Sequence, residues 1–268
     1  MTLAHQSPAA PLVPEAPNMI TLLNAAWGDS PTLGPLVHWL HRWENAVFAA
    51  LYVVGLTLIA WLATRRLQRV PASLQNVMEL AVERLDGLVH SVIGSAGRHF
   101  TPFVGTLFLY IITMNVAGMV PGLKSPTSNL NMTLALALCV FCYVQYTGMR
   151  RLGARRYVEH LLGDPQGVIG WVLAPLMGLI EIVGELVKPA SLALRLFANI
   201  TAEDALLGFF LALGATALAA LHSPVGLPLH ILFYPLTVLF SIIQALVFSL
   251  LTSVYLSMKL PHEKLHGQ

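Results

Sequence analysis

Uninterrupted apolar runs restrict this chain more than any other feature of its sequence. Several of them extend for about 18 residues or more, the length that a helix needs to cross roughly 30 Å of hydrocarbon. Of the 268 residues, 56% are hydrophobic and only 10% are charged, whereas a typical soluble domain has about 25% charged residues. The sequence therefore predicts an all-α, polytopic membrane protein surrounded by membrane lipid.

The charge balance and the cysteines argue against several classes of function. A net charge of +2 is too small to indicate a nucleic-acid partner. Cys139 and Cys142 form a C-x-x-C inside an apolar span, and no second pair or histidine cluster completes a metal site. We therefore interpret them as small buried hydrophobic residues and expect no metal and no cofactor. No Lys or Arg precedes Arg42, so the N-terminus lacks the basic start of a signal or transit peptide.

The hydropathy pattern predicts five membrane-embedded segments and one amphipathic helix. Residues 1–41 are rich in Pro, Ala, Ser and His, and we expect them outside the membrane and partly disordered near their start. A single membrane domain is expected over 42–268. Its parts are a span at 44–64, an amphipathic helix at 72–94, a hairpin at 101–148, a cytoplasmic loop at 149–166, and long segments at 168–221 and 225–260.

The segment 72–94 differs in kind from the spans. Its apolar side chains recur at steps of three and four residues, and its acidic and amide side chains fall largely elsewhere on the helical wheel. We interpret it as a helix lying in the membrane interface. An ordinary solvated helix is the alternative.

Basic residues in short loops predict the orientation, because they favour the cytoplasmic side. Arginines cluster at 65–69 and 150–156, and Lys259 and Lys264 lie near the C-terminus. These positions are expected in the cytoplasm, which leaves the N-terminus on the periplasmic side. The segments expected with the N-terminus are 1–41, 121–131 and 222–228.

The segment 168–221 is too long for an ordinary span. Some fifty helical residues extend roughly 75 Å, more than twice the thickness of the hydrocarbon. The helix is therefore expected either to break, at Pro175, at Pro189 or at a glycine, or to lie strongly inclined.

Arg195 lies deep inside this apolar segment. Its guanidinium stays charged at physiological pH, and a charge at membrane depth costs about 2.5 kcal/mol or far more. Such a residue needs an acidic partner, a hydrated cavity, or both. We therefore interpret Arg195 as a functional residue.

Other polar side chains align with Arg195. At 100° per residue, the polar side chains that align with Arg195 all fall within one arc of roughly 80° on the helix, whereas Asp204 points elsewhere. The final segment carries a comparable stripe, and two facing stripes would create a hydrated path for protons or small cations. The first stripe contains Glu181, Glu185, Lys188, Arg195, Asn199 and Glu203; the second contains His230, Tyr234, Thr237, Ser241, Gln244, Thr252 and Tyr255.

Titratable groups lie on both sides of Arg195. Glu181 and Glu185 are nearer the cytoplasmic end, and Glu203, Asp204 and His230 are nearer the opposite side. These groups bind and release protons, which a guanidinium does not. A fixed cation between them opposes direct passage of a proton. The arrangement suggests that a proton leaves this chain and later returns to it.

Three motifs, in the right order, resemble subunit a of F-type ATP synthases. They are GTLFLYIITMNVAGMVPGLKSPTSNLNMTLALAL (105–138), KPASLALRLFANITAED (188–204) and IIQALVFSLLTSVYLSM (242–258). The resemblance runs from the first span to the C-terminus. It implies two long, strongly inclined C-terminal helices that pack against a c-subunit ring. It also implies a b-subunit peripheral stalk, other ATP synthase subunits, and the bacterial inner membrane.

The resemblance implies that Arg195 is the essential arginine facing the ring carboxylates. Asn199 and Gln244 match its polar neighbours. Glu181 matches the acidic position of the cytoplasmic half-channel, and Ser191 matches a small polar residue close to it.

Glu203 and Asp204 match the acidic positions of the half-channel open to the periplasmic side. This pair replaces a commoner Gly–Glu or Asp–Glu, so which carboxyl carries the proton stays open. Ala198 stands where the family usually has Gly, which should slightly alter close helix approach.

Several alternatives remain open at the level of sequence. Arg195 is free to pair with Glu203, Glu185 or a neighbouring chain, and Glu181 and Glu185 are free to pair with Lys188. For the whole chain, a self-contained secondary transporter and a purely structural scaffold are the other candidates. No nucleophile–base pair, metal-ligand set or phosphate loop is present, so nucleotide chemistry is expected in partner subunits. His230 also fits a loop hydrogen bond, and Gln244 also fits a tie between the last two helices.

Overall fold

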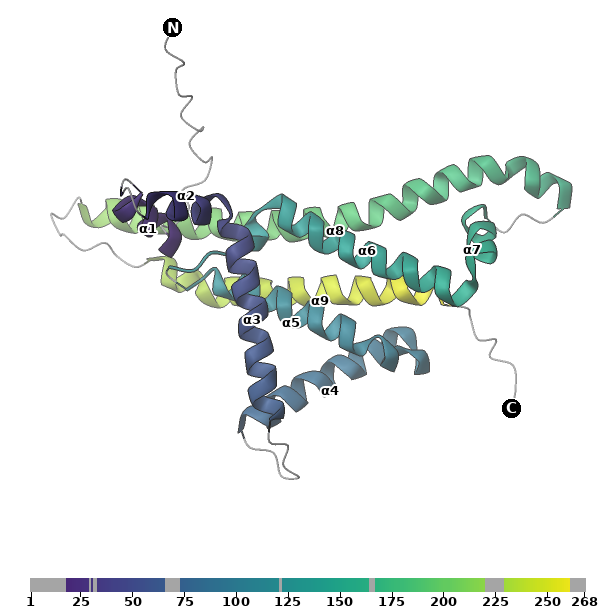
Figure 1. Ribbon diagram of the computed structural model, residues 1–268, viewed down its shortest axis with the longest axis horizontal. Helices are drawn as coiled ribbons and strands as arrows, with labels where there is room; N and C mark the ends of the chain where they lie inside the picture. The colour runs from purple at the N-terminus through teal and green to yellow at the C-terminus, as the bar shows by residue number, and fades with distance from the viewer. Residues whose placement is uncertain are drawn as a thin grey trace, which may run out of the picture.

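Helices form all the regular structure described in the computed structural model (Figure 1). Within that part of the chain there is no strand, which confirms the all-α, polytopic prediction. The residues outside the described part of the chain include Arg66, Arg69, Lys264, the 222–228 loop and the first 17 residues. The structure describes residues 18–28, 30, 33–65, 73–120, 122–163, 167–219 and 229–260.

Two short helices, which the sequence analysis did not predict, lie before the first span. They are α1 (Met19–Trp27) and α2 (Gly34–Arg42). The Asn18 side chain caps α1 by accepting from the Thr21 amide at 2.9 Å. Helix caps of this kind satisfy an otherwise unpaired amide.

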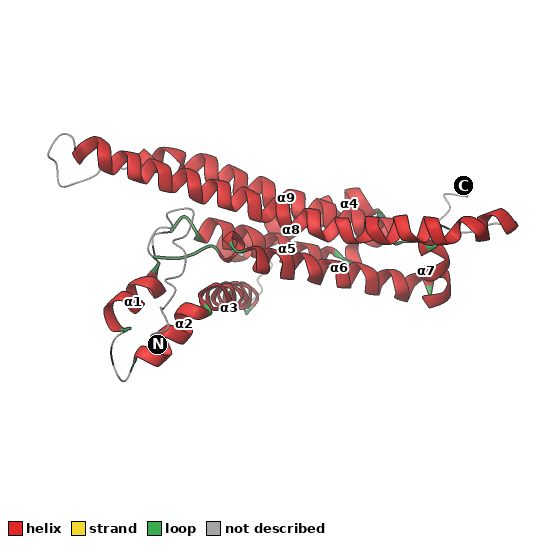
Figure 2. Ribbon diagram, turned by 90° about the horizontal axis from the view of Figure 1, so that it is seen from above, coloured by secondary structure: helices red, strands yellow, loops and turns green. Residues whose placement is uncertain are grey.

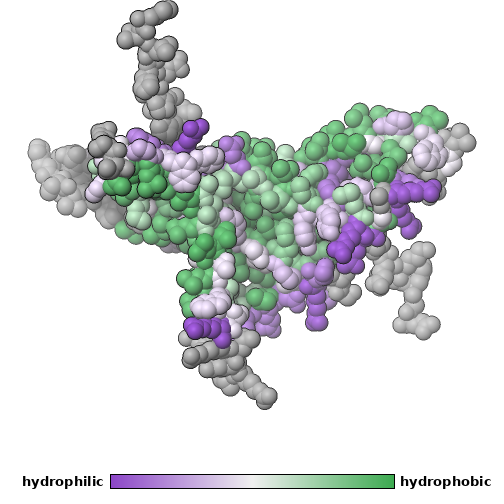
Figure 3. Space-filling model, viewed as in Figure 1, coloured by the Kyte–Doolittle hydropathy of each residue, from purple (hydrophilic) through white to green (hydrophobic). Residues whose placement is uncertain are grey.

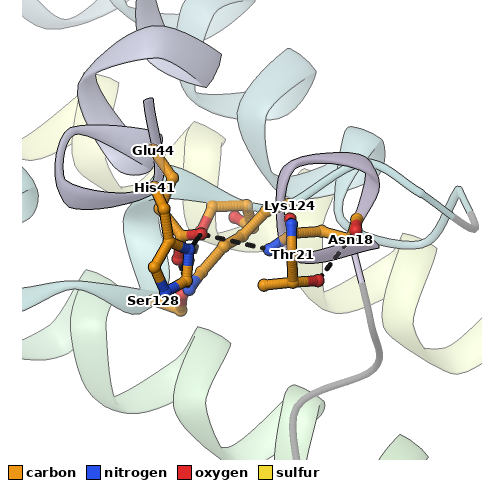
Figure 4. Close-up of polar contacts among 7 residues, drawn as sticks. Asn18, Thr21, His41, Glu44, Lys124 and Ser128 are labelled. Atoms are coloured by element: carbon orange, nitrogen blue, oxygen red, sulfur yellow. Dashed lines mark hydrogen bonds and ion pairs between the residues drawn. The ribbon is translucent and has the colours of Figure 1, made fainter. Parts of the chain in front are cut away.

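Glu44 anchors these helices to the rest of the protein (Figure 4). The Lys124 ammonium lies 2.6 Å from its Oε1, His41 Nδ1 lies 3.4 Å from its Oε2, and Asn18 Nδ2 donates to the same oxygen at 3.5 Å. The N-terminal helices are therefore fixed to the loop that contains Lys124.

The helix α3 (Glu44–Thr64) covers the same residues as the first predicted span, and α4 (Ser73–Ile93) lies in the predicted amphipathic segment. Figure 1 shows α3 crossing the bundle at a steep angle. The Tyr52 hydroxyl attaches α3 to the next hairpin by donating to the Lys124 carbonyl at 2.8 Å.

The predicted hairpin consists of α5 (Thr101–Ala117) and α6 (Leu130–Leu152), with the short 3-10 helices η1 (Ser95–His99) and η2 (Pro126–Ser128) before and between them. The segment 149–166, predicted as a cytoplasmic loop, contains helical structure. α6 continues to Leu152, and α7 (Ala154–Leu161) follows at once. Gly153, with φ of 80°, makes the turn between them, a conformation that favours glycine.

The helix α8 (Gly167–Ala219) runs through both Pro175 and Pro189 without a break. Its 53 residues extend about 80 Å at the rise of an α-helix. The expected break in this segment is therefore not formed, and a helix of this length has to lie inclined to stay within the membrane. Figures 1 and 2 show α8 alongside α9 (Tyr234–Met258), which follows η3 (Leu229–Phe233).

The core lies mainly between α5, α6, α8 and α9, and Val89 of α4 and Phe48 and Tyr52 of α3 also belong to it. α5 packs on α9, α6 packs on α8, and both α4 and α8 contact α9. Within the described residues, four helices are long and apolar enough to cross a membrane, and α5 is a shorter apolar helix. The most deeply buried large side chains are Phe100, Ile111, Leu192, Leu196, Ile200, Phe248 and Leu256.

Much of the apolar surface is left outside this core. Only 17% of the apolar window of α8 is buried within the chain itself. Figure 3 shows apolar side chains over most of one face, with hydrophilic ones gathered toward α7 and α4. Large exposed apolar surface of this kind marks contact with lipid or with other proteins.

The interpretation of Cys139 and Cys142 as buried is wrong. Both are exposed, free cysteines. α6 turns Ala137, Val140 and Val144 into the core, so the cysteines fall on its other side.

Candidate functional site

Arg195 lies on the outer side of α8. Its neighbours Leu192, Ala193 and Leu196 are 2%, 1% and 0% exposed, whereas Arg195 and Ala198 are exposed. Among the described residues, none forms a hydrogen bond or ion pair with the Arg195 guanidinium. The intrachain salt bridges to Glu203 and Glu185 that the sequence left open are thus not formed. The guanidinium therefore lies unpaired, among the described residues, on the exposed side of α8.

Asn199 lies one helical turn after Arg195 and is held by α9. Its Nδ2 donates to Gln244 Oε1 at 2.6 Å. Gln244 is only 3% exposed. The contact therefore ties α8 to α9 and fixes Asn199 close to the arginine.

The polar stripe predicted on α8 divides between two environments. Glu185 is buried, Glu181, Lys188 and Glu203 are half-buried, and Arg195 is exposed. On an ideal wheel Glu185 and Arg195 fall at opposite edges of the arc. The core covers one edge of that arc and leaves the other open.

The polar stripe of α9 faces inward for most of its length. Thr237, Ser241, Gln244 and Thr252 are all buried, and Thr237 Oγ1 lies 3.4 Å from the Met119 sulfur on the loop side of α5. The two predicted stripes therefore meet at Asn199 and Gln244, and again where the Lys188 ammonium lies 5.7 Å from the centre of the Tyr255 ring. Two more buried hydroxyls, Ser249 and Ser253, lie on the same helix but outside the arc of this stripe, and the sequence analysis missed them. The side chain of His230, which lies in η3, is outside the described residues.

Glu203 and Asp204 lie one turn beyond Asn199 and are both half-buried. The Oε1 atom of Glu203 is buried and has no hydrogen-bond partner among the described residues. Toward the other end of α8, Glu181 is half-buried and Ser191 is exposed, one turn before Arg195. The helix thus carries carboxyl groups on either side of the arginine.

Other orphaned polar atoms lie on α5 and α9, which pack against each other. In the described part of the chain, they include Asn115 Nδ2, Ser241 Oγ, Gln244 Nε2 and Ser249 Oγ. A dry unpaired group of this kind costs about 1–3 kcal/mol, and ordered water is the usual partner of such groups. The arrangement favours water along the packed sides of α5 and α9.

Asn115 is a candidate that the sequence analysis missed. It is 3% exposed on α5, and its Oδ1 accepts from Thr127 Oγ1 at 2.9 Å. Its Nδ2 is buried without a hydrogen-bond partner among the described residues. A single amide within the apolar run 101–117 was the available signal.

Glu185 has a different environment from the other carboxyl groups. The Lys188 and Lys259 ammonium groups lie 2.6 and 2.9 Å from its Oε1, and Gln145 Nε2 donates to its Oε2 at 2.9 Å. Lys259, which the sequence suggested only as a cytoplasmic charge, is 3% exposed.

Tyr157 on α7 completes this group by donating a short hydrogen bond to Gln145 Oε1. Burial raises the pKa of Tyr157, and the charges of Glu185 and then Glu181 raise it further. The phenol is therefore a neutral donor at physiological pH. Across the described residues, no three His, Cys, Asp or Glu side chains are grouped to hold a metal ion.

Comparison with known proteins identifies the family. A model described as the ATP synthase A chain matches residues 46–257. The ATP synthase subunit a of Protochlamydia amoebophila is 42% identical over 97% of this chain and 94% of its own length. The subunit a of Solidesulfovibrio magneticus is 42% identical over 82% of this chain and 85% of its own. The subunit a of Geobacter sulfurreducens is 36% identical over 80% of this chain and 86% of its own length. The chain belongs to the ATP synthase subunit a family.

Proposed function

We propose that this chain is the proton-translocating stator subunit of a rotary ATP synthase. Two offset half-channels deliver protons to the carboxylates of a c-subunit ring and remove them, and Arg195 separates the two. The observation that carries the proposal is the unpaired, outward-facing guanidinium of Arg195, with carboxyl groups on both sides of it along one helix.

The offset follows from the helix itself. Glu181 and Glu203 lie 14 residues before and 8 residues after Arg195, which corresponds to about 21 Å and about 12 Å along α8. A proton cannot hop such distances without water or intervening groups. The two carboxyl groups therefore serve separate pockets.

In the outer pocket, Glu203 and Asp204 accept protons, and Asn199, held by Gln244, contacts the arriving ring carboxylate. The protonated ring site is neutral and moves out into lipid. After nearly a full revolution it reaches the inner pocket at Glu181 and loses its proton. It then passes Arg195 as an anion, which the guanidinium stabilises.

The fixed cation prevents a proton from crossing directly between the two pockets. A proton on the stator is repelled by Arg195, so it crosses only while carried by the ring. Each unit charge that crosses 100 mV releases about 2.3 kcal/mol, and this free energy turns the ring. The orphaned atoms of Asn115, Ser241 and Gln244 support a hydrated outer pocket.

The proposal includes the surroundings of the chain. It places the protein in a bacterial inner membrane, with the N-terminus in the periplasm and the C-terminus in the cytoplasm. The c ring covers the Arg195 side, and a b-subunit peripheral stalk holds the stator still.

Arg195→Ala tests the proposal in vesicles that contain the assembled complex. We expect the complex to assemble and ATP-driven proton pumping to be abolished. Arg155→Ala is the control, because Arg155 is 94% exposed on α7 in a surface pair with Glu159. Normal pumping by Arg195→Ala would contradict the proposal. Proton flux by the purified chain alone in liposomes would favour a secondary transporter instead.

A further inference from the structure

A cluster of charges buried between α6, α8 and α9 surrounds Glu185. Both of its carboxylate oxygens are used: Oε1 by the Lys188 and Lys259 ammonium groups, and Oε2 by Gln145. Glu185 is 5% exposed and Lys259 is 3% exposed. A buried carboxylate with three donors is well satisfied, and it has no open position for a mobile proton.

Aromatic rings enclose the two lysines. The Lys259 ammonium lies 5.4 Å from the centre of the Tyr157 ring, and the Lys188 ammonium lies 5.7 Å from the centre of the Tyr255 ring. Cations attract ring faces at these distances. The cluster thus joins four helices, α6 to α9, at one end of the bundle.

Pro189 makes the position of this cluster significant. Proline has no amide hydrogen and crowds the carbonyl four residues before it, and that carbonyl belongs to Glu185. The α8 backbone therefore loses a hydrogen bond at Glu185, the residue whose side chain has three donors. α8 nevertheless continues as one helix through this point.

The rotation of α8 after Pro189 decides where Arg195 points. A slip of one residue in helical phase turns every later side chain by about 100°. Arg195 follows Pro189 by six residues and lies next to Leu196, which is fully buried. Such a slip would move the guanidinium from the outer side of α8 into the packed interior.

We propose that Glu185 is a positioning residue that clamps α8 across Pro189 and holds Arg195 on the outer side. It does this through Lys188, Lys259 and Gln145. The two lysines and one carboxylate leave the cluster with a net charge of +1, which also repels protons from the seam between α8 and α9. This inference rests on the proposed function, and it assigns Glu181, not Glu185, to the inner pocket.

The test uses inverted membrane vesicles that contain the assembled complex. Two quantities are measured, the ratio of proton pumping to ATP hydrolysis and the passive proton conductance after the catalytic sector is removed. The variants are Glu185→Gln and Lys259→Gln, each alone and each combined with Pro189→Ala. Glu44→Gln is the matched control, because Glu44 also pairs with a lysine at 2.6 Å but lies outside the α8–α9 seam (Figure 4).

We expect both single variants to lower the pumping ratio by about tenfold or more. Glu185→Gln leaves the buried Lys259 ammonium without its carboxylate, and Lys259→Gln removes the ion pair between Glu185 and the end of α9. Passive conductance should persist in both. Pro189→Ala, which restores an amide able to reach the Glu185 carbonyl, should recover much of the ratio. Glu44→Gln should leave the ratio unchanged.

Two results would overturn the inference. One is loss of passive conductance in Glu185→Gln while Lys259→Gln conducts normally, which is the behaviour of a proton carrier. The other is a normal pumping ratio in both variants. If the complex with Glu185→Gln does not assemble, the inference is tested by the pumping ratio of Lys259→Gln, measured with and without Pro189→Ala. Normal pumping by Arg195→Ala is a separate outcome and overturns the proposed function itself.

Discussion

Replacement of Gln244 by leucine tests whether the seam between α8 and α9 contains water. Gln244 is 3% exposed. Its Oε1 accepts from Asn199 at 2.6 Å, and its Nε2 is buried with no partner among the described residues. Gln244→Leu keeps a side chain of similar size and removes both polar atoms.

The sign of the change in stability depends on that water. The variant loses one hydrogen bond between helices, which contributes about 0.6 kcal/mol on average in a membrane protein. If the seam is dry, the variant also removes an unpaired amide and recovers about 1–3 kcal/mol, so it should be more stable. If water already satisfies the amide, nothing is recovered, and the variant should be less stable by about 0.5–1.5 kcal/mol.

We expect the second result, because the half-channel requires water at this position. The free energy of unfolding can be measured by titrating the protein in lipid bicelles with SDS. A double-mutant cycle with Asn199→Ala should give a coupling energy of about 0.6 kcal/mol. A variant stabilised by 1 kcal/mol or more, on the scale of the dry amide's cost, would show a dry seam and refute this reasoning.

Two further predictions concern titratable side chains. Glu203→Gln and Asp204→Asn, made separately, should show by the rate of proton pumping in vesicles which acid carries the proton; equal, normal rates in both would mean that the outer half-channel lies elsewhere. Because the pKa of Tyr157 is raised above its ordinary value of 10.0, the unfolded chain releases this proton first as the pH rises. The protein should therefore lose stability above about pH 10, and Tyr157→Phe should remove part of that loss; identical pH profiles for the two proteins would contradict the assignment.

The membrane-spanning architecture could be predicted from sequence because hydropathy and helical period are local properties. The run 46–64 is apolar apart from two threonines, and α3 covers these residues. The two N-terminal helices were missed because each is only 9 residues long, too short for a clear helical period, and contacts such as that between Lys124 and Glu44 fix them from a distance.

The sequence of α8 alone does not determine whether the helix breaks at its prolines or which of its sides the core covers. A proline inside a helix weakens it, but neighbouring helices decide whether it breaks. A wheel shows that Glu185 and Arg195 share a broad face, but not which edge of that face the core covers. The same limit explains the error at Cys139 and Cys142, since the sequence of an apolar membrane helix does not show which of its sides packs against other helices.

The partners of Glu185 were the least predictable part of the candidate site. Lys188 is three residues away on the same helix, so its pairing with Glu185 was open from the start. Gln145 and Lys259 come from other helices, 40 and 74 residues away, and only packing brings them together. Lys259 looked like a cytoplasmic loop charge because it follows an apolar run directly.

Cysteine cross-linking of the face that carries Arg195 tests the central claim most directly. In a complex in which Cys139 and Cys142 are replaced by serine, Ala198→Cys places a thiol on the exposed side of α8, one turn from Arg195. Ala193→Cys, at a position 1% exposed, is the control. The account predicts a disulfide between position 198 and a cysteine placed beside the carboxylate of a c subunit, and none from position 193. Cross-linking from position 193 but not from position 198 would mean that Arg195 does not face the ring.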